Sequence, residues 1–571
     1  MRINTITHYA YFMTAIRSHF LPSLMLLFVA FVAISCTTPP ASSPLVIPAN
    51  TSLAETAVNS TPEPLDTTPT LPPAPTAPPT ALPPSVWIDP NLPVAFTDNL
   101  ELPTEFIRTD DPKTADLRIA PGAGQSIATW VYALAAPFPT IPDHIDSTNL
   151  IAFWQQGSAQ GFPASRLLVS SETHALFTQT WGSPSPQVTV LPEADLLSAA
   201  WSASDAWTIL PFEALAPRWK VLEIDRASPV RKDFDPTTYP LAVSISIEGD
   251  SALLSQFSGT YLTNRDPQKL TTVMLTGVTA LVRGTAAYMR LFGMNYPAAD
   301  IAPWLQEADI LHINNEVPFA PVCPLYPPEN ALVFCSRPEY IELLEHIGTD
   351  VVELSGDHFH DWGDEAILYT LEMYKERGWP YYGGGANLDE ARRPLLMEHN
   401  GNRIAFMGCN GKAPWYARAS ETEPGAWHCD IPWMKTEIAR LRAEGFLVIV
   451  TFQHEEVPTY EVHPKLMSDF QPIADAGANI VSGSQAHQPQ AIEFRGDSFI
   501  HYGLGNLFFD QIYISDPNAE AFIDRHIIYD GRHISTELLT IQFVDYARAR
   551  PMTDAERQQL LETIFSVSIW N

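Results

Sequence analysis

Four short apolar runs in the second half of the chain are each followed by side chains suited to metal binding or acid–base chemistry. Carboxylates and imidazoles ligate divalent cations of borderline softness, such as manganese, zinc or iron. The same groups act as general acids and bases. The four sets are Asn314, Asn315 and Glu316; Asp357, His358, His360 and Asp361; Gln453, His454, Glu455 and Glu456; and Ser484, Gln485 and His487. A histidine taken alone is more often structural, so a functional site requires that the four sets meet in space.

The apolar runs before these sets are expected to be strands of one layered α/β domain. Such runs recur between Thr272 and Val481, separated by segments of helical period such as Glu365 to Arg377. Several of these segments end at a glycine, for example Gly378, as helix C-caps favour. This alternation over about residues 270–571 indicates the α/β class. Ligands in such folds gather beyond the carboxyl ends of the strands, so the four sets should share one rim.

A late aromatic segment, His501 to Asp510, contains Gly503 and Gly505. Glycine weakens a strand and therefore often marks a place where another backbone or a ligand approaches closely. The sequence leaves open whether that neighbour is a ligand or another strand.

The first 36 residues have the pattern of an export signal. Arg2 and Arg17 precede the apolar run from Phe20 to Ile34, and the tail Ala33-Ile34-Ser35-Cys36 resembles a bacterial lipobox. Cleavage before Cys36 would leave that cysteine to carry lipid and hold the chain outside the cytoplasm. The alternative is an uncleaved signal anchor, for which the apolar run is short. Residues 37–85 are rich in Pro, Thr and Ser and are expected to be a disordered linker.

The chain is strongly acidic, with 65 acidic against 33 basic residues and a net charge of −32. Such a surface repels nucleic acid, which we exclude as a general partner. It would also resist a polyanionic polymer unless a local basic patch compensates. The arginines considered for such a patch are Arg337, Arg392, Arg393 and Arg418.

Four cysteines remain once Cys36 is set aside, and four cysteines allow three pairings. Short loops favour the pairs Cys323–Cys335 and Cys409–Cys429 in an oxidising compartment. A site of four thiolates on one metal is the rival interpretation. It is disfavoured because no pair has the close spacing of zinc-binding cysteines.

Residues 86–265 are expected to form a first, smaller α/β domain. Strand-like runs such as Leu167 to Val169 alternate with helical segments such as Glu193 to Trp201. The stretch from Trp207 to Leu222 resembles part of the type 2 periplasmic solute-binding fold. The alternative is a generic α/β module without a ligand.

Five motifs follow one another within residues 273–510: Asn314–Glu316, Ser355–His358, Gln453–Glu455, Gly483–His487 and Tyr502–Asn506. Their order resembles the CapA family of poly-gamma-glutamate capsule synthesis (PGA_cap), which is related in fold to calcineurin-like metallophosphatases. The first strand, however, ends at Thr276-Gly277-Val278, where family members carry an Asp that is a presumed metal ligand. His454 would point to the other face if its strand continues through it.

A bridged pair of cations needs several anionic ligands, and this chain lacks the Asp of the family pattern. The resemblance therefore implies a metal site with fewer ligands than a two-metal site requires. One divalent ion (Mn, Zn or Fe) remains compatible, and the alternative is a metal-free site that holds a sugar or peptide. The candidate metal ligands are Glu316, Asp357, His358, His454 and His487. His358 and His487 are also the candidate catalytic acids. The candidate substrate-binding residues are Asn315, Asp361, Gln485 and Asn506.

The resemblance also implies a function. The leading hypothesis is an extracytoplasmic lipoprotein that acts in the synthesis, export or anchoring of a capsular polymer, either poly-gamma-glutamate or a polysaccharide. Other capsule-assembly proteins are the partners that it implies. The alternatives are a metal-dependent phosphoesterase or hydrolase, and a non-catalytic protein that binds a solute or a polymer.

Overall fold

The computed structural model describes residues 82–255, 257, 261–325, 332–412, 414–484 and 486–570. The predicted signal with Cys36, most of the 37–85 linker, and Gln485 lie outside the described residues. Residues 81–571 form one compact unit. Among the described helices, none is both long and apolar enough to cross a membrane.

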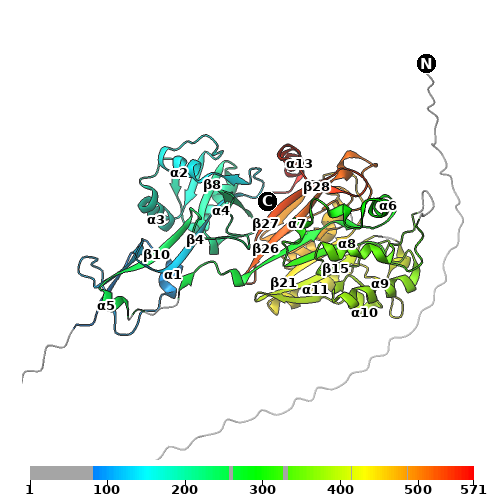
Figure 1. Ribbon diagram of the computed structural model, residues 1–571, viewed down its shortest axis with the longest axis horizontal. Coiled ribbons are helices and arrows are strands. Elements are labelled where there is room, and N and C mark those ends of the chain that lie inside the picture. The colour runs from blue at the N-terminus through cyan, green and yellow to red at the C-terminus, as the bar shows by residue number, and fades with distance from the viewer. Residues whose placement is uncertain are drawn as a thin grey trace, which may run out of the picture. The chain divides into compact units, whose positions relative to one another are not determined.

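The first part of this unit is built on a large mixed sheet with the strand order β2-β1-β3-β10-β4-β8-β6-β7 (Figure 1). The predicted helix from Glu193 is present as α4 (Glu193–Ser202), with α2 (Ser147–Gln156) and α3 (Ser171–Trp181) earlier in the chain. The strands are β1 (Ser85–Ile88), β2 (Ile107–Arg108), β3 (Leu117–Pro121), β4 (Gln125–Pro137), β6 (Arg166–Val169), β7 (Val188–Val190), β8 (Ala206–Pro211) and β10 (Ala242–Gly249).

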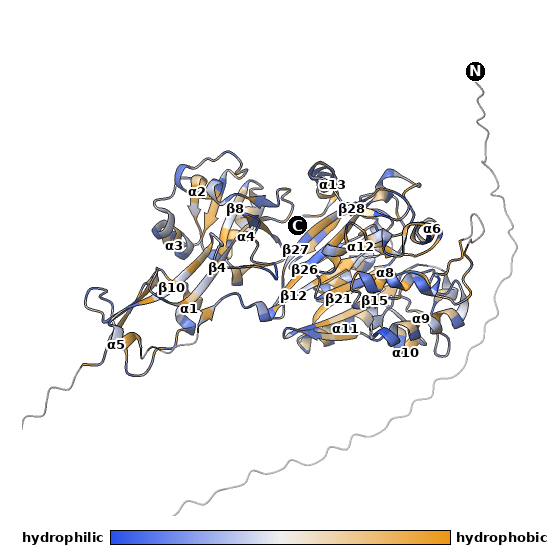
Figure 2. Cartoon of the chain, in the orientation of Figure 1, coloured by the Kyte–Doolittle hydropathy of each residue, from blue (hydrophilic) through white to orange (hydrophobic). Residues whose placement is uncertain are grey.

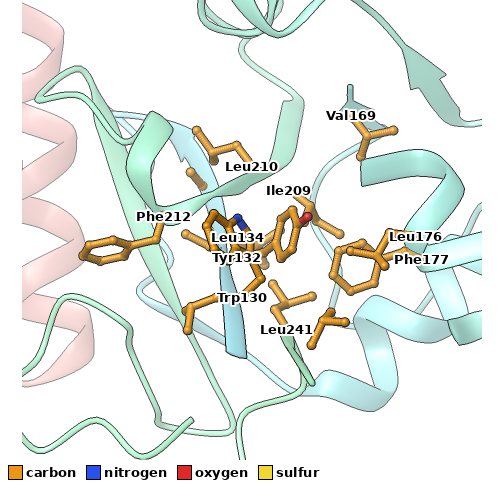
Figure 3. Packing of buried hydrophobic residues seen from close by; sticks show 14 of the residues in the cluster. Trp130, Tyr132, Leu134, Val169, Leu176, Phe177, Ile209, Leu210, Phe212 and Leu241 are labelled. Carbon is orange, nitrogen blue, oxygen red and sulfur yellow. The ribbon is translucent and has the colours of Figure 1, made fainter. Parts of the chain in front are cut away.

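Aromatic side chains of β4 and α3 form the centre of the first hydrophobic core. Trp130, Tyr132 and Leu134 alternate along β4 and are all buried, and Tyr132 meets Phe177 of α3 edge to face at 5.3 Å (Figure 3). Alternate residues of a strand point to the same face, so β4 supplies three consecutive core residues from one side. Leu270, Ile527, Tyr529 and Ile534 of the second part also join this core, so the two parts share it.

The second part contains two sheets. The larger has the order β16-β15-β14-β12-β26-β27-β28 and the smaller has the order β18-β19-β21-β22-β24-β23. The strands of the larger sheet are β12 (Leu270–Thr276), β13 (Val278–Thr279), β14 (Ile310–Asn315), β15 (Val351–Glu353), β16 (Tyr381–Tyr382), β25 (Asn506–Phe508), β26 (Glu520–Tyr529), β27 (Arg532–Phe543) and β28 (Ala549–Pro551). Those of the smaller are β18 (Leu395–His399), β19 (Asn402–Asn410), β21 (Leu447–Gln453), β22 (Ile480–Gly483), β23 (Ile492–Arg495) and β24 (Ser498–His501).

Alternate residues of the strands point to opposite faces, and the two sheets pack together in an α/β/β/α sandwich. In β12, Val273 and Leu275 join the core between the sheets, whereas Met274 joins the core under the helices α6 (Arg283–Phe292), α8 (Ile341–His346) and α9 (Gly363–Arg377). Helices α11 (Ile431–Ala443) and α12 (Pro464–Asp475) cover the smaller sheet in the same way. Strand β21 is hydrophobic along almost its whole length, as both of its faces are covered (Figure 2). The predicted layered α/β fold class is confirmed.

Three buried histidines lie on β24 of the smaller sheet and on β26 and β27 of the larger sheet. His501 pairs with Asp524 at 2.7 Å, and His526 and His533 share the hydroxyl group of Thr536 at 2.8 Å each. Burial holds the pKa of His526 well below its ordinary value and lowers that of His533 to about 4. The folded chain therefore keeps both imidazoles neutral.

Acidification is expected to destabilise the fold through these two histidines. A base whose pKa is lowered on folding contributes full stability above its unfolded pKa of about 6.5 and loses it as the pH falls toward the folded value. For His533 the loss between pH 7 and pH 5 should be about 2 kcal/mol. Urea unfolding at both pH values would show it. The His533→Gln chain should lose that much less on acidification than the wild type, whereas the exposed control His346→Gln should match the wild type.

Candidate functional site

The carboxyl ends of strands from both sheets converge, as the strand-end argument predicts. Glu316 follows β14, Asp357 and His358 follow β15, and Lys412 follows β19. Gln453 ends β21, and Glu456 comes three residues later. We call these six residues the rim site.

Glu316, Asp357 and His358 form the centre of the rim site. Their ligand atoms all lie within 4.8 Å of one another. Gln453 donates its amide to Oδ1 of Asp357 at 3.0 Å and to Oε1 of Glu316 at 3.4 Å. The two loops come this close because residue 356 is glycine, where a Cβ atom would lie 2.5 Å from the carbonyl oxygen of Glu316.

Lys412 brings a fixed positive charge to the same centre. Its Nζ lies 3.0 Å from Oδ2 of Asp357 and 2.7 Å from Oε1 of Glu456, and its side chain is only 16% exposed. Both carboxylate oxygens of Asp357 therefore have a donor from the protein, Gln453 at Oδ1 and Lys412 at Oδ2.

The buried charges of the rim site shift one another's pKa. Burial, and then the neighbouring Asp357, raise the pKa of Glu316 to about 8. Burial opposes the charges of Asp357 and His358, but their neighbours outweigh it. Lys412 and His358 lower the pKa of Asp357, while the hydrogen bond to Asp361 and the charge of Asp357 raise that of His358 to about 9. At neutral pH, Glu316 holds a proton, Asp357 is an anion and His358 is a cation.

The donor set of the centre fits one divalent cation. Two carboxylates and one imidazole match manganese, zinc or iron, and the three ligand atoms are close enough to hold an ion. Such an ion would supply Lewis acidity at the rim, and Glu316 and His358 would have to release their protons to ligate it.

His487 lies beside the rim site, outside the central group of three. Its Nδ1 pairs with Oδ1 of Asn506 at 2.9 Å, and Asn506 in turn donates to the His487 carbonyl oxygen at 3.0 Å. Its Nε2 therefore faces Glu456, 3.9 Å from Oε2. Burial lowers the pKa of His487, so the ring is neutral.

Two predicted site residues are placed elsewhere. His454 pairs with Asp469 at 2.8 Å on the opposite face of its strand, because the preceding residue, Gln453, points into the rim. Asn315 donates to the carbonyl oxygen of Val317 at 2.7 Å and to Tyr374 at 2.8 Å. The structure therefore does not bring His454 to the metal cluster, nor Asn315 to the rim as a substrate-binding residue.

Asp361 positions His358 rather than standing free for substrate. Its Oδ2 accepts from Nδ1 of His358 at 2.6 Å and from the backbone amide of Phe334 at 2.8 Å. Tyr416 donates to its other oxygen at 3.2 Å. Asp361 thus joins the rim site to an exposed aromatic residue.

Sequence reasoning missed two residues that matter to the site. Lys412 follows the apolar run of β19, whose end is not among the four sets above, and the same strand-end rule applied to that run would find it. Glu353 is fully buried beneath the rim. Its carboxylate lies 3.3 Å from Nε2 of His312 and accepts a hydrogen bond from Asn314 at 3.0 Å. Asn314 in turn donates to Gln453 at 3.4 Å. A carboxylate inside a strand gives no signal that distinguishes it from an exposed one.

Both predicted disulfides, Cys323–Cys335 and Cys409–Cys429, are confirmed. The first lies in the segment after Glu316. The second ties the end of β19, three residues before Lys412, to the segment before α11. Each therefore restrains a loop that leads into the rim site.

Comparison with known proteins places the rim site inside a recognised family segment. Residues 257–511 match the family described as "Bacterial capsule synthesis protein PGA_cap". The chain is 23% identical over 277 residues to "Capsule biosynthesis protein CapA" of Bacillus anthracis, covering 48% of this chain and 67% of that relative. It is 24% identical over 194 residues to "PGA biosynthesis protein CapA" of Bacillus subtilis strain 168, covering 34% of this chain and 51% of the relative.

Among solved structures, the calcineurin-like phosphoesterase YfkN from Bacillus subtilis aligns with 52% of this chain and 98% of its own, at 11% identity and a TM-score of 0.32. The family match and the two relatives confirm the CapA resemblance for this part of the chain.

Proposed function

We propose that this chain acts in the assembly, export or anchoring of a capsular polymer at the cell envelope, and that it binds the polymer at the rim site. The family match and the names of the two relatives support a capsule role. The lipobox predicted at Cys36 supports a membrane-anchored, extracytoplasmic location.

The observation that carries the proposal is an aromatic lip beside the rim site, formed by Trp415 and Tyr416. Trp415 is 63% exposed and Tyr416 58% exposed. Tyr416 is tied to the centre of the site through Asp361 and His358. Adjacent exposed aromatic residues beside a polar site are typical of binding surfaces, because their faces gain more from a partner than from water.

The lip favours a polysaccharide over poly-gamma-glutamate. Aromatic faces pack well against the apolar faces of sugar rings, whereas polyglutamate offers a flexible chain of carboxylates. The net charge of −32 also opposes a polyanion. Arg418 lies over the Trp415 ring at 4.6 Å and is the one cation of the predicted patch that the described residues place at the lip.

Removing the lip is expected to weaken polymer binding at least about tenfold, the size of one lost aromatic anchor at a binding site. Retention on immobilised capsular polysaccharide and on immobilised poly-gamma-glutamate would be compared for the wild type, Trp415→Ala and Tyr416→Ala. Tyr261→Ala is the matched control, since Tyr261 is 54% exposed and lies far from the rim in sequence. Retention on polyglutamate alone would reverse the choice of polymer. Equal retention of all four proteins would contradict binding at the lip.

A metal-dependent phosphoesterase is the second candidate, and the close group of Glu316, Asp357 and His358 favours it. Turnover of an aryl phosphoester with added Mn²⁺, lost in Asp357→Ala, would establish this activity. No turnover with a loaded site would leave the binding role.

A further inference from the structure

We propose that the ammonium group of Lys412 takes the place of a divalent cation in a second site formed by Asp357, Glu456 and His487. This inference rests on the proposed function only in that Asp357 also belongs to the central group of Glu316, Asp357 and His358. It concerns how many ions the rim can hold, and it stands or falls separately from polymer binding.

The ammonium group occupies the position of a shared counter-ion. Nζ of Lys412 lies 3.0 Å from Asp357 and 2.7 Å from Glu456, so it bridges two carboxylates from different strand ends. The side chain is largely enclosed, which fixes the charge in place. A lysine ammonium is a compact point charge and serves here as a permanent monovalent cation.

His487 lies beside Glu456 and presents one ring nitrogen to it. The amide oxygen of Asn506 can only accept, and Asn506 is oriented by its donation to the His487 carbonyl. The proton of His487 is therefore on Nδ1, and its lone pair is on Nε2, which faces Glu456 at 3.9 Å. Metal-ligating histidines are held in this way, with the other ring nitrogen donating to a fixed acceptor.

Two carboxylates thus contact Lys412, and one imidazole nitrogen lies beside the second of them. These are the same donor types as in the group of Glu316, Asp357 and His358. Transition-metal ions bind such donors at about 2.0–2.2 Å, closer than the ammonium holds them. With Lys412 present, a divalent ion at this position would meet an enclosed positive charge. Without Lys412, the carboxylates of Asp357 and Glu456 would lack the positive charge that lies between them. A divalent ion could then supply that charge.

Metal stoichiometry tests this directly. The purified full chain, stripped of metal and reloaded with Mn²⁺, should hold at most one ion, and Lys412→Ala should hold one more ion than the wild type. Lys412→Gln is the second variant, which keeps hydrogen bonding to the carboxylates if the alanine chain does not fold. Lys412→Arg keeps the charge and should match the wild type. The double variant Lys412→Ala/Glu456→Ala should lose the added ion.

Lys465→Ala is the matched control, because Lys465 forms an exposed ion pair with Glu455. Glu455 precedes Glu456 in the segment after β21. It should leave the number of ions unchanged. Electron paramagnetic resonance would locate the added Mn²⁺, since two ions sharing Asp357 should show spin coupling. Two ions in the wild type, or an unchanged count in both folded Lys412 variants, would overturn the proposal, whereas the polymer assay is unaffected by either result.

Discussion

Asp357→Ala is expected to abolish divalent-metal binding at the rim site. Asp357 contributes to the close group of three ligands and also accepts from Gln453 and Lys412, so it is the residue that all parts of the site share. Losing even an indirect partner of a metal ligand costs about 10- to 100-fold in affinity, so losing a ligand should cost at least about 100-fold. Metal analysis of the loaded, purified chain would show the occupancy falling from about one ion to under about a tenth.

Asp469→Ala is the control for this prediction. Asp469 pairs with His454, the histidine that the structure turns away from the rim, so this change should leave the occupancy at the wild-type value. Loss of the ion in Asp469→Ala would return His454 to the list of ligands. Asp357→Asn preserves the size of the side chain and separates loss of the ligand from loss of the fold. A wild-type chain that holds under about a tenth of an ion after loading would remove the metal from the rim and leave a hydrogen-bonded binding site.

Gly483→Ala is expected to destabilise the fold by about 3 kcal/mol or more, at the upper end of what overpacking costs. A Cβ atom at residue 483 would overlap the carbonyl oxygen of Tyr502, which is backbone and cannot turn aside. Gly483 ends β22, so a shift here would also move the segment that carries His487. Urea unfolding followed by tryptophan fluorescence would measure the change in free energy.

Gly122→Ala is the matched control for steric overlap. The nearest atom to a Cβ at residue 122 is the Ser246 hydroxyl oxygen at 3.4 Å, an ordinary contact. The change should alter stability by less than about 0.5–1 kcal/mol. Equal effects of the two substitutions would contradict the close approach of β22 to Tyr502.

Close backbone contacts of the same kind answer the question left open by Gly503 and Gly505. Gly505 has φ +84°, and a Cβ there would lie 2.7 Å from the carbonyl oxygen of Glu520. At Gly503 a Cβ would lie 2.5 Å from the Cβ of Ala486. Neighbouring segments of the chain therefore explain both glycines.

Local features of this protein followed from the sequence by itself. The apolar runs between Thr272 and Val481 became strands, and the helix predicted from Glu365 to Arg377 ends at Gly378 in a left-handed cap. Both disulfides paired as their short loops favoured. These features depend on residues near one another in the chain, where spacing and residue type carry the physical information. The strand-end rule also predicts that Glu316, Asp357 and His358 lie on one rim, where they form the close group of three.

Only the tertiary structure decided which charges meet. Whether Gln453 or His454 faces the rim depends on the register of a single strand end, and a shift of one residue reverses the face. The contacts of Lys412 with Asp357 and Glu456 join residues on three different strand ends. The pKa values of Glu316 and His358 follow from burial and from neighbours that only folding assembles. The sequence thus determined where polar groups would gather, while the packing of the two sheets determined which of these groups meet and how they shift one another's pKa.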